Sequence, residues 1–220
     1  KDIYRAGAER WNGLVQMGMT DLGGNLDIVS SFLPGEKLLL ELYDTPREVK
    51  RLGWEAHSAW WRYFKELDAS IRTVNPGYTG WTAIFSAEPY YILQCDFCYM
   101  IGPDMFDEFV KPELAASCQR LKNAFYHLDG PGQLPHLDSL LTIPELAGVL
   151  WVFGAGQPGV EAWGDVYRKI RAAGKKMQIW GTGEDLEKLH KHLGTLEGVI
   201  LLGWASSKAE AESVIAKWAK

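Results

Sequence analysis

Apolar residues in the second half of the chain come in short runs, and each run is followed by a segment with helical spacing. Such an alternation predicts right-handed βαβ units around a parallel sheet. The runs are apolar throughout instead of alternating with polar residues, which indicates strands covered on both faces. The expected strands are 123–128, 148–154, 175–181 and 198–204, and the expected helices are 134–143, 159–174, 184–194 and 207–220.

The first half has longer helical patterns. The longest runs from Pro46 to about Ile71, with Thr45 as its N-cap and Glu48 completing a capping box. Pro112 is expected to kink or split another helix. The remaining expected helices are 1–12, 25–32, 36–44 and 102–122, and the expected strands are 13–24, 81–86 and 90–97.

These patterns give roughly six or seven strands, one or two short of a (βα)8 barrel. We therefore expect residues 1–220 to form a single α/β domain, a TIM-type barrel that lacks its N-terminal strand or strands. An open, doubly wound sheet is the alternative architecture.

Composition excludes several classes of protein. The net charge is −5, and no cluster of Lys and Arg forms a basic patch, so we expect no nucleic-acid partner. No apolar run approaches the ~20 residues of a membrane span, so no membrane partner is expected. Three cysteines fit a reducing compartment, and a cytoplasmic location is the expectation.

Ligands of parallel α/β folds bind where the strands end. This rule selects Asp21, Asp96, His127, Asp129 and the neighbouring Gln94 as polar candidates. The same rule selects the aromatic candidates Trp151, Trp180 and Trp204 as walls of a substrate pocket.

His127 and Asp129 are two residues apart, so both side chains lie on one face of a strand. They are expected to hold a metal ion or a polar group of a substrate. The alternative is that Asp129 caps a turn while His127 is a satisfied residue at the pocket edge. His136 and Asp138 are expected on the surface, and no role is assigned to His57.

Two further motifs are less specific. Residues 154–159, GAGQPG, match the glycine pattern of dinucleotide-binding loops, but the acid expected about 20 residues later is not at a strand end. Cys95 and Cys98 form a C-x-x-C motif without a second pair at zinc-ligand spacing, so buried thiols are the favoured interpretation.

The segments "ILQCDFCYMIGPDMFDEFVKPEL", "YHLDGPG", "GVLWV" and "GKKMQIWG" resemble, in order and spacing, the uroporphyrinogen decarboxylase superfamily. That superfamily includes cobalamin-dependent methyltransferases, and the likeness is greatest to decarboxylase-like proteins associated with corrinoid methyltransferase systems. The resemblance implies a (βα)8 barrel with a longer N-terminus. It also implies a substrate pocket, a corrinoid supplied by a partner protein, and zinc bound at a His-x-Cys motif.

The chain departs from the family pattern at several positions. Asp96 stands where the decarboxylases have a serine, and Trp204 stands where they have a histidine. Asp129 replaces the first zinc-binding cysteine, and no cysteine follows Cys118. Porphyrinogen decarboxylation is therefore disfavoured, while a zinc site of His127 and Asp129 stays an expectation, since zinc accepts carboxylate ligands.

The leading hypothesis is a methyltransferase-like enzyme of corrinoid-linked one-carbon metabolism, with Asp96, His127 and Asp129 as catalytic residues and Asp21 and Gln94 as substrate contacts. The alternative is a non-catalytic protein that binds a corrinoid, a tetrapyrrole or a methylated amine. A nicotinamide-dependent enzyme acting through GAGQPG is the third possibility.

Overall fold

The computed structural model describes residues 1–219, and its centre is a five-stranded sheet in which every pair of neighbouring strands is parallel. The strands are β1 (Tyr90–Leu93), β2 (Asn123–Asp129), β3 (Leu146–Val152), β4 (Lys176–Gly181) and β5 (Val199–Gly203). The helices before the sheet are α1 (Asp2–Trp11), α2 (Asn25–Phe32), α3 (Gly35–Asp44) and α4 (Pro46–Ile71).

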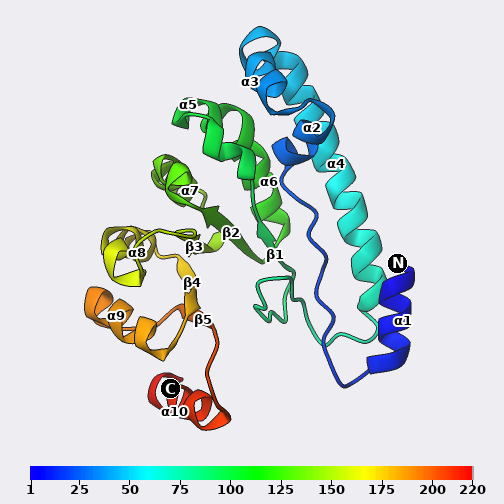
Figure 1. The fold of residues 1–220 in the computed structure, drawn as a ribbon. Helices are drawn as coiled ribbons and strands as arrows, with labels where there is room; N and C mark the ends of the chain where they lie inside the picture. Colours follow the sequence, from blue (N-terminus) through cyan, green and yellow to red (C-terminus); the bar gives the residue numbers. More distant parts are fainter. Residues whose placement is uncertain (220) are drawn as a thin grey trace.

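Helical segments connect each strand to the next (Figure 1). From β1 to β2 these are η1 (Asp96–Met100), α5 (Pro103–Met105), η2 (Phe106–Val110) and α6 (Lys111–Arg120). The later ones are η3 (Pro131–His136), α7 (Leu137–Leu141), η4 (Val160–Trp163), α8 (Gly164–Ala172), α9 (Gly183–Leu193) and, after β5, α10 (Lys208–Trp218). Among residues 1–219, no helix is long and apolar enough to cross a membrane.

The strands follow one another across the sheet in the order β1-β2-β3-β4-β5. A doubly wound sheet instead starts in its middle and reverses direction at a switch point. The observed order is therefore unlike the doubly wound alternative and is compatible with part of an α/β barrel. The expected count of six or seven strands is wrong for residues 1–219, where the sheet has five.

The segment 13–24, expected to be a strand, is extended but joins no sheet. Its backbone groups bond to side chains and a loop instead of a strand ladder. Met17 exchanges two hydrogen bonds with the Asn75 side chain, and the Met19 N–H donates to the Thr79 carbonyl oxygen at 2.8 Å. The Leu22 N–H donates to the Tyr91 hydroxyl at 2.7 Å, which places this segment beside β1.

Residues 81–86 also differ from the strand expected there. Ala83 has a left-handed backbone with a φ of 55°, and its N–H donates to the Gly80 carbonyl oxygen. A non-glycine residue in this region of φ and ψ breaks an extended run. Only Ser86 keeps a β contact, an isolated antiparallel bridge to Tyr78.

The long helix α4 has the predicted bounds, but the predicted capping box is absent. Thr45 ends α3 as well as preceding α4, and its hydroxyl donates to the Glu41 carboxylate. The Glu48 carboxylate accepts from Arg51 instead of reaching back to the cap. Pro112 fulfils its expected effect, since the helical run 103–120 contains a π-helical turn just before it.

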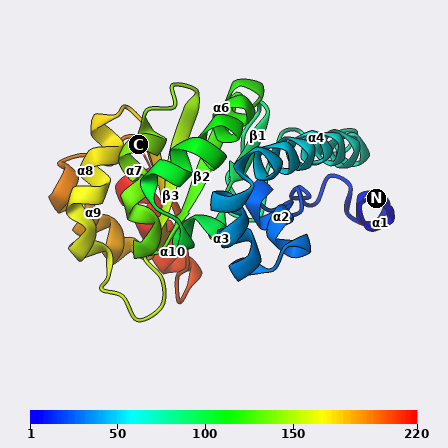
Figure 2. The same cartoon turned by 90° about the horizontal axis from the view of Figure 1, so that it is seen from above.

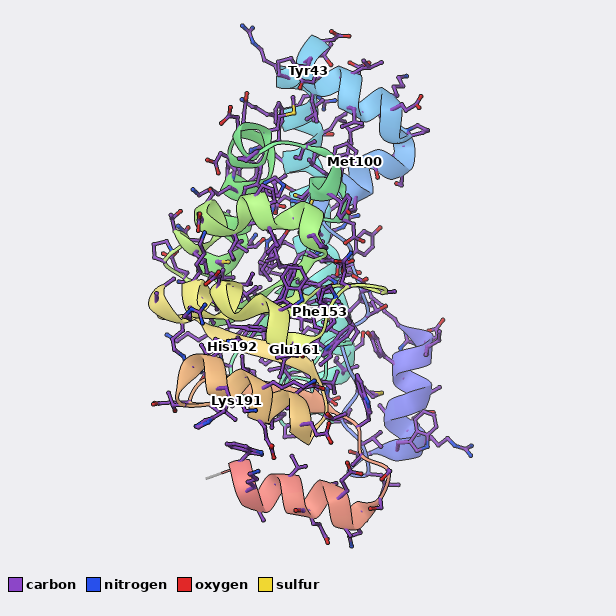
Figure 3. All side chains as sticks on the ribbon, turned by 60° about the vertical axis from the view of Figure 1, so that its left-hand side comes forward. Tyr43, Met100, Phe153, Glu161, Lys191 and His192 are labelled. Carbon is purple, nitrogen blue, oxygen red and sulfur yellow. The ribbon has the colours of Figure 1, made fainter. Side chains whose placement is uncertain are left out.

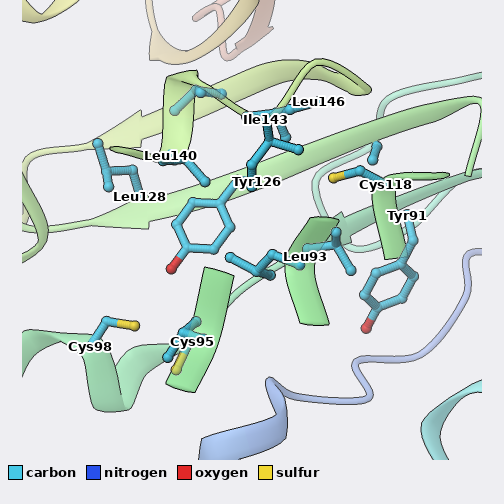
Figure 4. Close-up of a cluster of buried hydrophobic side chains, with 14 of the residues drawn as sticks. Tyr91, Leu93, Cys95, Cys98, Cys118, Tyr126, Leu128, Leu140, Ile143 and Leu146 are labelled. Atoms are coloured by element: carbon cyan, nitrogen blue, oxygen red, sulfur yellow. The ribbon is translucent and has the colours of Figure 1, made fainter. Parts of the chain in front are cut away.

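Both faces of the sheet are apolar, as the strand sequences predict. Tyr91, Leu93, Tyr126 and Leu128 belong to the large cluster shared with the helices, which Figure 4 shows together with Cys118 and Leu140. We call this side the helix-covered face. The alternate residues form a second, smaller cluster, which we call the inner face: Ile84, Tyr90, Ile92, Phe125 and Leu150.

The helices lie unevenly around this sheet. Seen from above, α1 and the N-terminus lie at the opposite end of the molecule from α8 and α9 (Figure 2). The strand β5 is only half-buried, whereas β1 is buried along its length. The sheet is therefore better covered at β1, one of the two strands whose ends carry the predicted polar residues, than at β5.

Candidate active site

The candidate active site lies at the carboxyl ends of β1 and β2. Gln94 follows the last residue of β1, and Asp129 is the last residue of β2. Asp21 reaches the same place from the extended segment 13–24. Its carboxylate accepts from the Gln94 amide nitrogen at 3.4 Å and from the Tyr91 hydroxyl, also at 3.4 Å.

His127 and Asp129 lie on one face of β2, as their spacing predicts. The His127 Nε2 and Asp129 Oδ2 atoms are 3.9 Å apart, which is ion-pair distance but too long for a hydrogen bond. His127 is 8% exposed, and its ring is enclosed by two tryptophans. The Trp81 ring meets it edge-on at 5.0 Å between centroids, and the Trp180 ring lies nearly parallel at 6.3 Å.

The pKa values of two site residues are shifted in ways that favour acid–base chemistry. Burial lowers the pKa of His127 below its ordinary value, against the opposing charges of Asp129 and Asp21. Burial also raises the pKa of Asp96, and the charges of Asp27, Asp129 and Asp21 add to this increase. The imidazole is therefore held neutral, while the Asp96 carboxyl keeps its proton more readily than an ordinary aspartate.

Asp27 is a site residue that sequence reasoning missed. Its carboxylate accepts from the backbone N–H groups of Gly24, Asp96 and Phe97 at 3.1, 3.1 and 2.8 Å. It thereby fixes the backbone of Asp96 to the start of α2. Gly24 must remain glycine for this contact, because a Cβ there would lie 2.2 Å from the Gln94 carbonyl oxygen.

Within residues 1–219, Nδ1 of His127 and Oε1 of Gln94 are buried and have no hydrogen-bond partner, and both residues are 8% exposed. A buried polar group without a partner costs about 1–3 kcal/mol, so such atoms are uncommon in the interior of a folded protein. Their position beside Asp21 and Asp129 leaves hydrogen-bonding capacity free for a ligand.

The three tryptophans expected to wall a pocket do lie together. Trp151, Trp180 and Trp204 line one cavity of about 330 Å³ at the ends of β3 and β4. The Trp180 ring also stacks on His127, so this cavity adjoins the polar residues at the end of β2. Whether the tryptophans bind a substrate stays a prediction.

The zinc expectation can be compared with the donor atoms present. His127 and Asp129 supply two donors, whereas a catalytic zinc ion commonly takes three protein ligands. Among residues 1–219, no group of three or more His, Cys, Asp or Glu side chains is arranged to hold a metal ion. These two donors alone do not complete a zinc site, so zinc stays a prediction, and no step proposed below passes through it.

Cys95 and Cys98 are buried free thiols, as the favoured interpretation of the C-x-x-C motif predicts. A hydrogen bond to Cys98, followed by burial, raises the pKa of Cys95 well above its ordinary value. A thiol with a raised pKa is a poor nucleophile and a poor metal ligand at neutral pH. The pair therefore belongs to the packing beneath the site.

Two histidines expected to be exposed or without a role are buried. His136 is 1% exposed, its ring stacks on Phe106 at 4.7 Å, and its Nε2 lies 2.8 Å from the Cys98 carbonyl oxygen. The surface assignment of His136 is therefore wrong. His57 lies 3.5 Å from the buried Glu113 carboxylate, a pair that sequence reasoning also missed.

The GAGQPG loop follows β3 and turns through two glycines with left-handed backbones, Gly154 and Gly156. The cavity beside this loop is lined by the Asp185 carboxylate, and within residues 1–219 its lining includes no Lys or Arg. A pyrophosphate needs positive charge or free helix N-terminal amides. At the start of α9, however, the Asp185 carboxylate already accepts from the Thr182 N–H at 2.9 Å.

In comparisons with protein-family models, curated proteins and solved structures, no match to this chain was found.

Proposed function

We propose that this chain is a small-molecule enzyme of the uroporphyrinogen decarboxylase and methyltransferase type, built on a (βα)8 barrel of which the five strands form a part. The observation that carries the proposal is the convergence of His127, Asp129, Asp21, Gln94 and Asp96 where β1 and β2 end. The sequence resemblance supplies the reaction class, which is methyl transfer in corrinoid-linked one-carbon metabolism.

In this proposal His127 is the general base. Because burial lowers its pKa, the imidazole is neutral and accepts a proton from a substrate thiol or hydroxyl. A corrinoid on a partner protein would supply the methyl group to the deprotonated sulfur or oxygen and would keep the electron pair of the bond that breaks. Asp21 and Gln94 orient the substrate, and Asp96 passes the proton taken up by His127 to solvent.

The test measures transfer of a methyl group from methylcobalamin to 2-mercaptoethanol, followed in the visible spectrum of the corrinoid. We expect the protein to accelerate the reaction and His127→Gln to lower the rate by about 10²–10⁴-fold, the usual contribution of a general base. His190→Gln is the matched control, because His190 lies on α9 against Trp218 instead of in the site.

Equal rates for wild type and His127→Gln would contradict the proposed base. A spectral shift on binding of cobalamin or a porphyrin without any methyl transfer would instead favour the non-catalytic binding protein.

Zinc stays a prediction of the resemblance, and metal analysis tests it separately. About one equivalent of zinc in wild type that is lost in His127→Gln would support a ligand role for this histidine. The same content in both proteins would contradict that role without affecting the acid–base proposal.

A further inference from the structure

The aromatic cavity at the ends of β3 and β4 has chemistry of its own. Its volume of about 330 Å³ lies within the range of small-molecule sites. Trp204, one of its lining residues, is 63% exposed, so solvent reaches the cavity there. The lining includes Trp151, Phe153, Tyr167, Trp180, Asp185 and Trp204.

Within residues 1–219, three of these residues carry a buried polar atom without a hydrogen-bond partner. They are Nε1 of Trp151, Nε1 of Trp180 and the hydroxyl of Tyr167. Trp151 is 2% exposed, and Tyr167 is fully buried. An indole nitrogen can only donate a hydrogen bond, so the Trp151 atom requires an acceptor. Trp151 and Tyr167 come from β3 and α8, so two different elements bring a side chain with an unused polar group to the lining of one cavity. The Trp180 ring instead lies against His127 and Trp81.

The charges around the cavity determine which acceptor fits. Burial raises the pKa of Tyr167, and the charges of Asp185 and Glu161 raise it further, so the phenol keeps its proton and can donate. Figure 3 labels Glu161 and the lining residue Phe153. Among residues 1–219, no Lys or Arg lines the cavity, and the Asp185 carboxylate does. Lys188 lies 3.6 Å from that carboxylate but outside the lining, so the cavity offers an anion no positive charge of its own and an uncharged ligand fits better.

The shape of the lining favours a flat ring. Trp163 lies behind the lining. Its ring packs edge-on against Trp151, with 5.1 Å between centroids, and stacks on Phe153, with 6.3 Å between centroids, so it fixes the positions of both lining rings. Rings fixed in this way present faces and edges for an aromatic ligand. Gly154 has a φ of 87° with no atom within 4 Å of the position of a Cβ, so the loop leaves this side of the cavity open.

We propose that this cavity binds an uncharged, flat, ring-shaped molecule whose carbonyl-type oxygen accepts hydrogen bonds from Trp151 and Tyr167. The site is independent of methyl transfer and adjoins the candidate active site through Trp180. The same arrangement disfavours a dinucleotide, since a pyrophosphate would meet the Asp185 carboxylate.

Calorimetric titration of the full chain with three probes tests the proposal. Coumarin is flat and uncharged and has a carbonyl acceptor, naphthalene lacks the acceptor, and coumarin-3-carboxylate adds a negative charge. We expect coumarin to bind more tightly than either of the others. Tyr167→Phe, which removes only the hydroxyl, should weaken coumarin binding about fivefold to tenfold and leave naphthalene within twofold.

Trp151→Phe is the second variant, and it should also weaken the binding of coumarin more than the binding of naphthalene, which has no acceptor. His127→Gln should bind coumarin as wild type does, so a failure of the methyl-transfer proposal is distinguishable from a failure of this one. No binding of coumarin, equal binding of coumarin and naphthalene, or an equal effect of Tyr167→Phe on both probes would overturn the proposal.

Discussion

The two faces of β2 use their polar groups in opposite ways. On the helix-covered face, the Tyr126 hydroxyl donates to the Gln133 side-chain oxygen at 3.1 Å, and the Gln133 amide donates to the Cys95 carbonyl oxygen at 3.1 Å. On the inner face, His127 keeps an unpartnered Nδ1, and nearby Gln94 keeps an unpartnered Oε1. The first arrangement is complete without a ligand, whereas the second leaves hydrogen-bonding capacity unused.

This difference separates stability from function along a single strand. Residues of β2 on the helix-covered face should matter mainly for the free energy of unfolding, because they pack against other parts of the protein. Residues of the inner face near the strand end should matter little for folding and strongly for ligand binding. Substitutions matched across the two faces test this separation.

The largest expected effect is a loss of free energy of unfolding when a packed side chain is truncated. Leu128 is fully buried on the helix-covered face, and Leu128→Ala should lower the free energy of unfolding by about 2–5 kcal/mol through lost contacts and a cavity. Val152 is half-buried beside the inner-face cluster, so Val152→Ala should cost about 1 kcal/mol. Urea unfolding followed by tryptophan fluorescence measures both, and equal losses would contradict the distinction between the faces.

The next effect concerns two buried glutamines. Gln133→Met leaves both the Tyr126 hydroxyl and the Cys95 carbonyl oxygen unpartnered, so it should destabilise the protein by about 2–4 kcal/mol. Gln94→Met removes one long hydrogen bond and an already unpartnered oxygen, so it should change stability by less than about 0.5 kcal/mol. Thermal and urea unfolding of both variants provide the measurement. A large loss for Gln94→Met would show that its amide serves the fold.

The sequence predicts the sheet well from residue 123 onward, because each apolar run there is also a ladder strand. It fails at segments 13–24 and 81–86, which are apolar enough to be strands. For 13–24, the reason lies far away in sequence, since Asn75 and Tyr91 supply the hydrogen bonds that a neighbouring strand would have made. Periodicity along one segment carries no information about such partners.

The candidate active site was predictable only where it depends on local strand geometry and not on contacts between distant parts of the sequence. The spacing of two residues places His127 and Asp129 together, because it follows from strand geometry alone. Asp27 was missed because an acid in the first turn of a helix ordinarily indicates a local cap, and here it also binds the backbone after β1. His136 was placed on a helix surface, but it ends a 3-10 segment and its ring is covered by Phe106, which is thirty residues earlier.

The smallest expected effect is the dependence of stability on pH through His127. Burial places its folded pKa below the ordinary value of 6.5, so in acid the unfolded chain binds a proton that the folded chain does not. The free energy of unfolding should therefore fall as the pH decreases below 6.5, until the folded pKa is passed. His127→Gln removes this contribution, so its stability should depend less steeply on pH between about 8 and 5.

Asp129→Asn gives the opposite change and so tests the cause of the shift. The charge of Asp129 opposes the effect of burial, and its removal should lower the pKa of His127 further. Stability of Asp129→Asn should then fall more steeply than that of wild type as the pH decreases, whereas stability of His127→Gln falls less steeply. Urea unfolding at a series of pH values measures all three proteins. If the three show the same dependence on pH, His127 is not held neutral by burial, and its proposed role as a base loses its physical support.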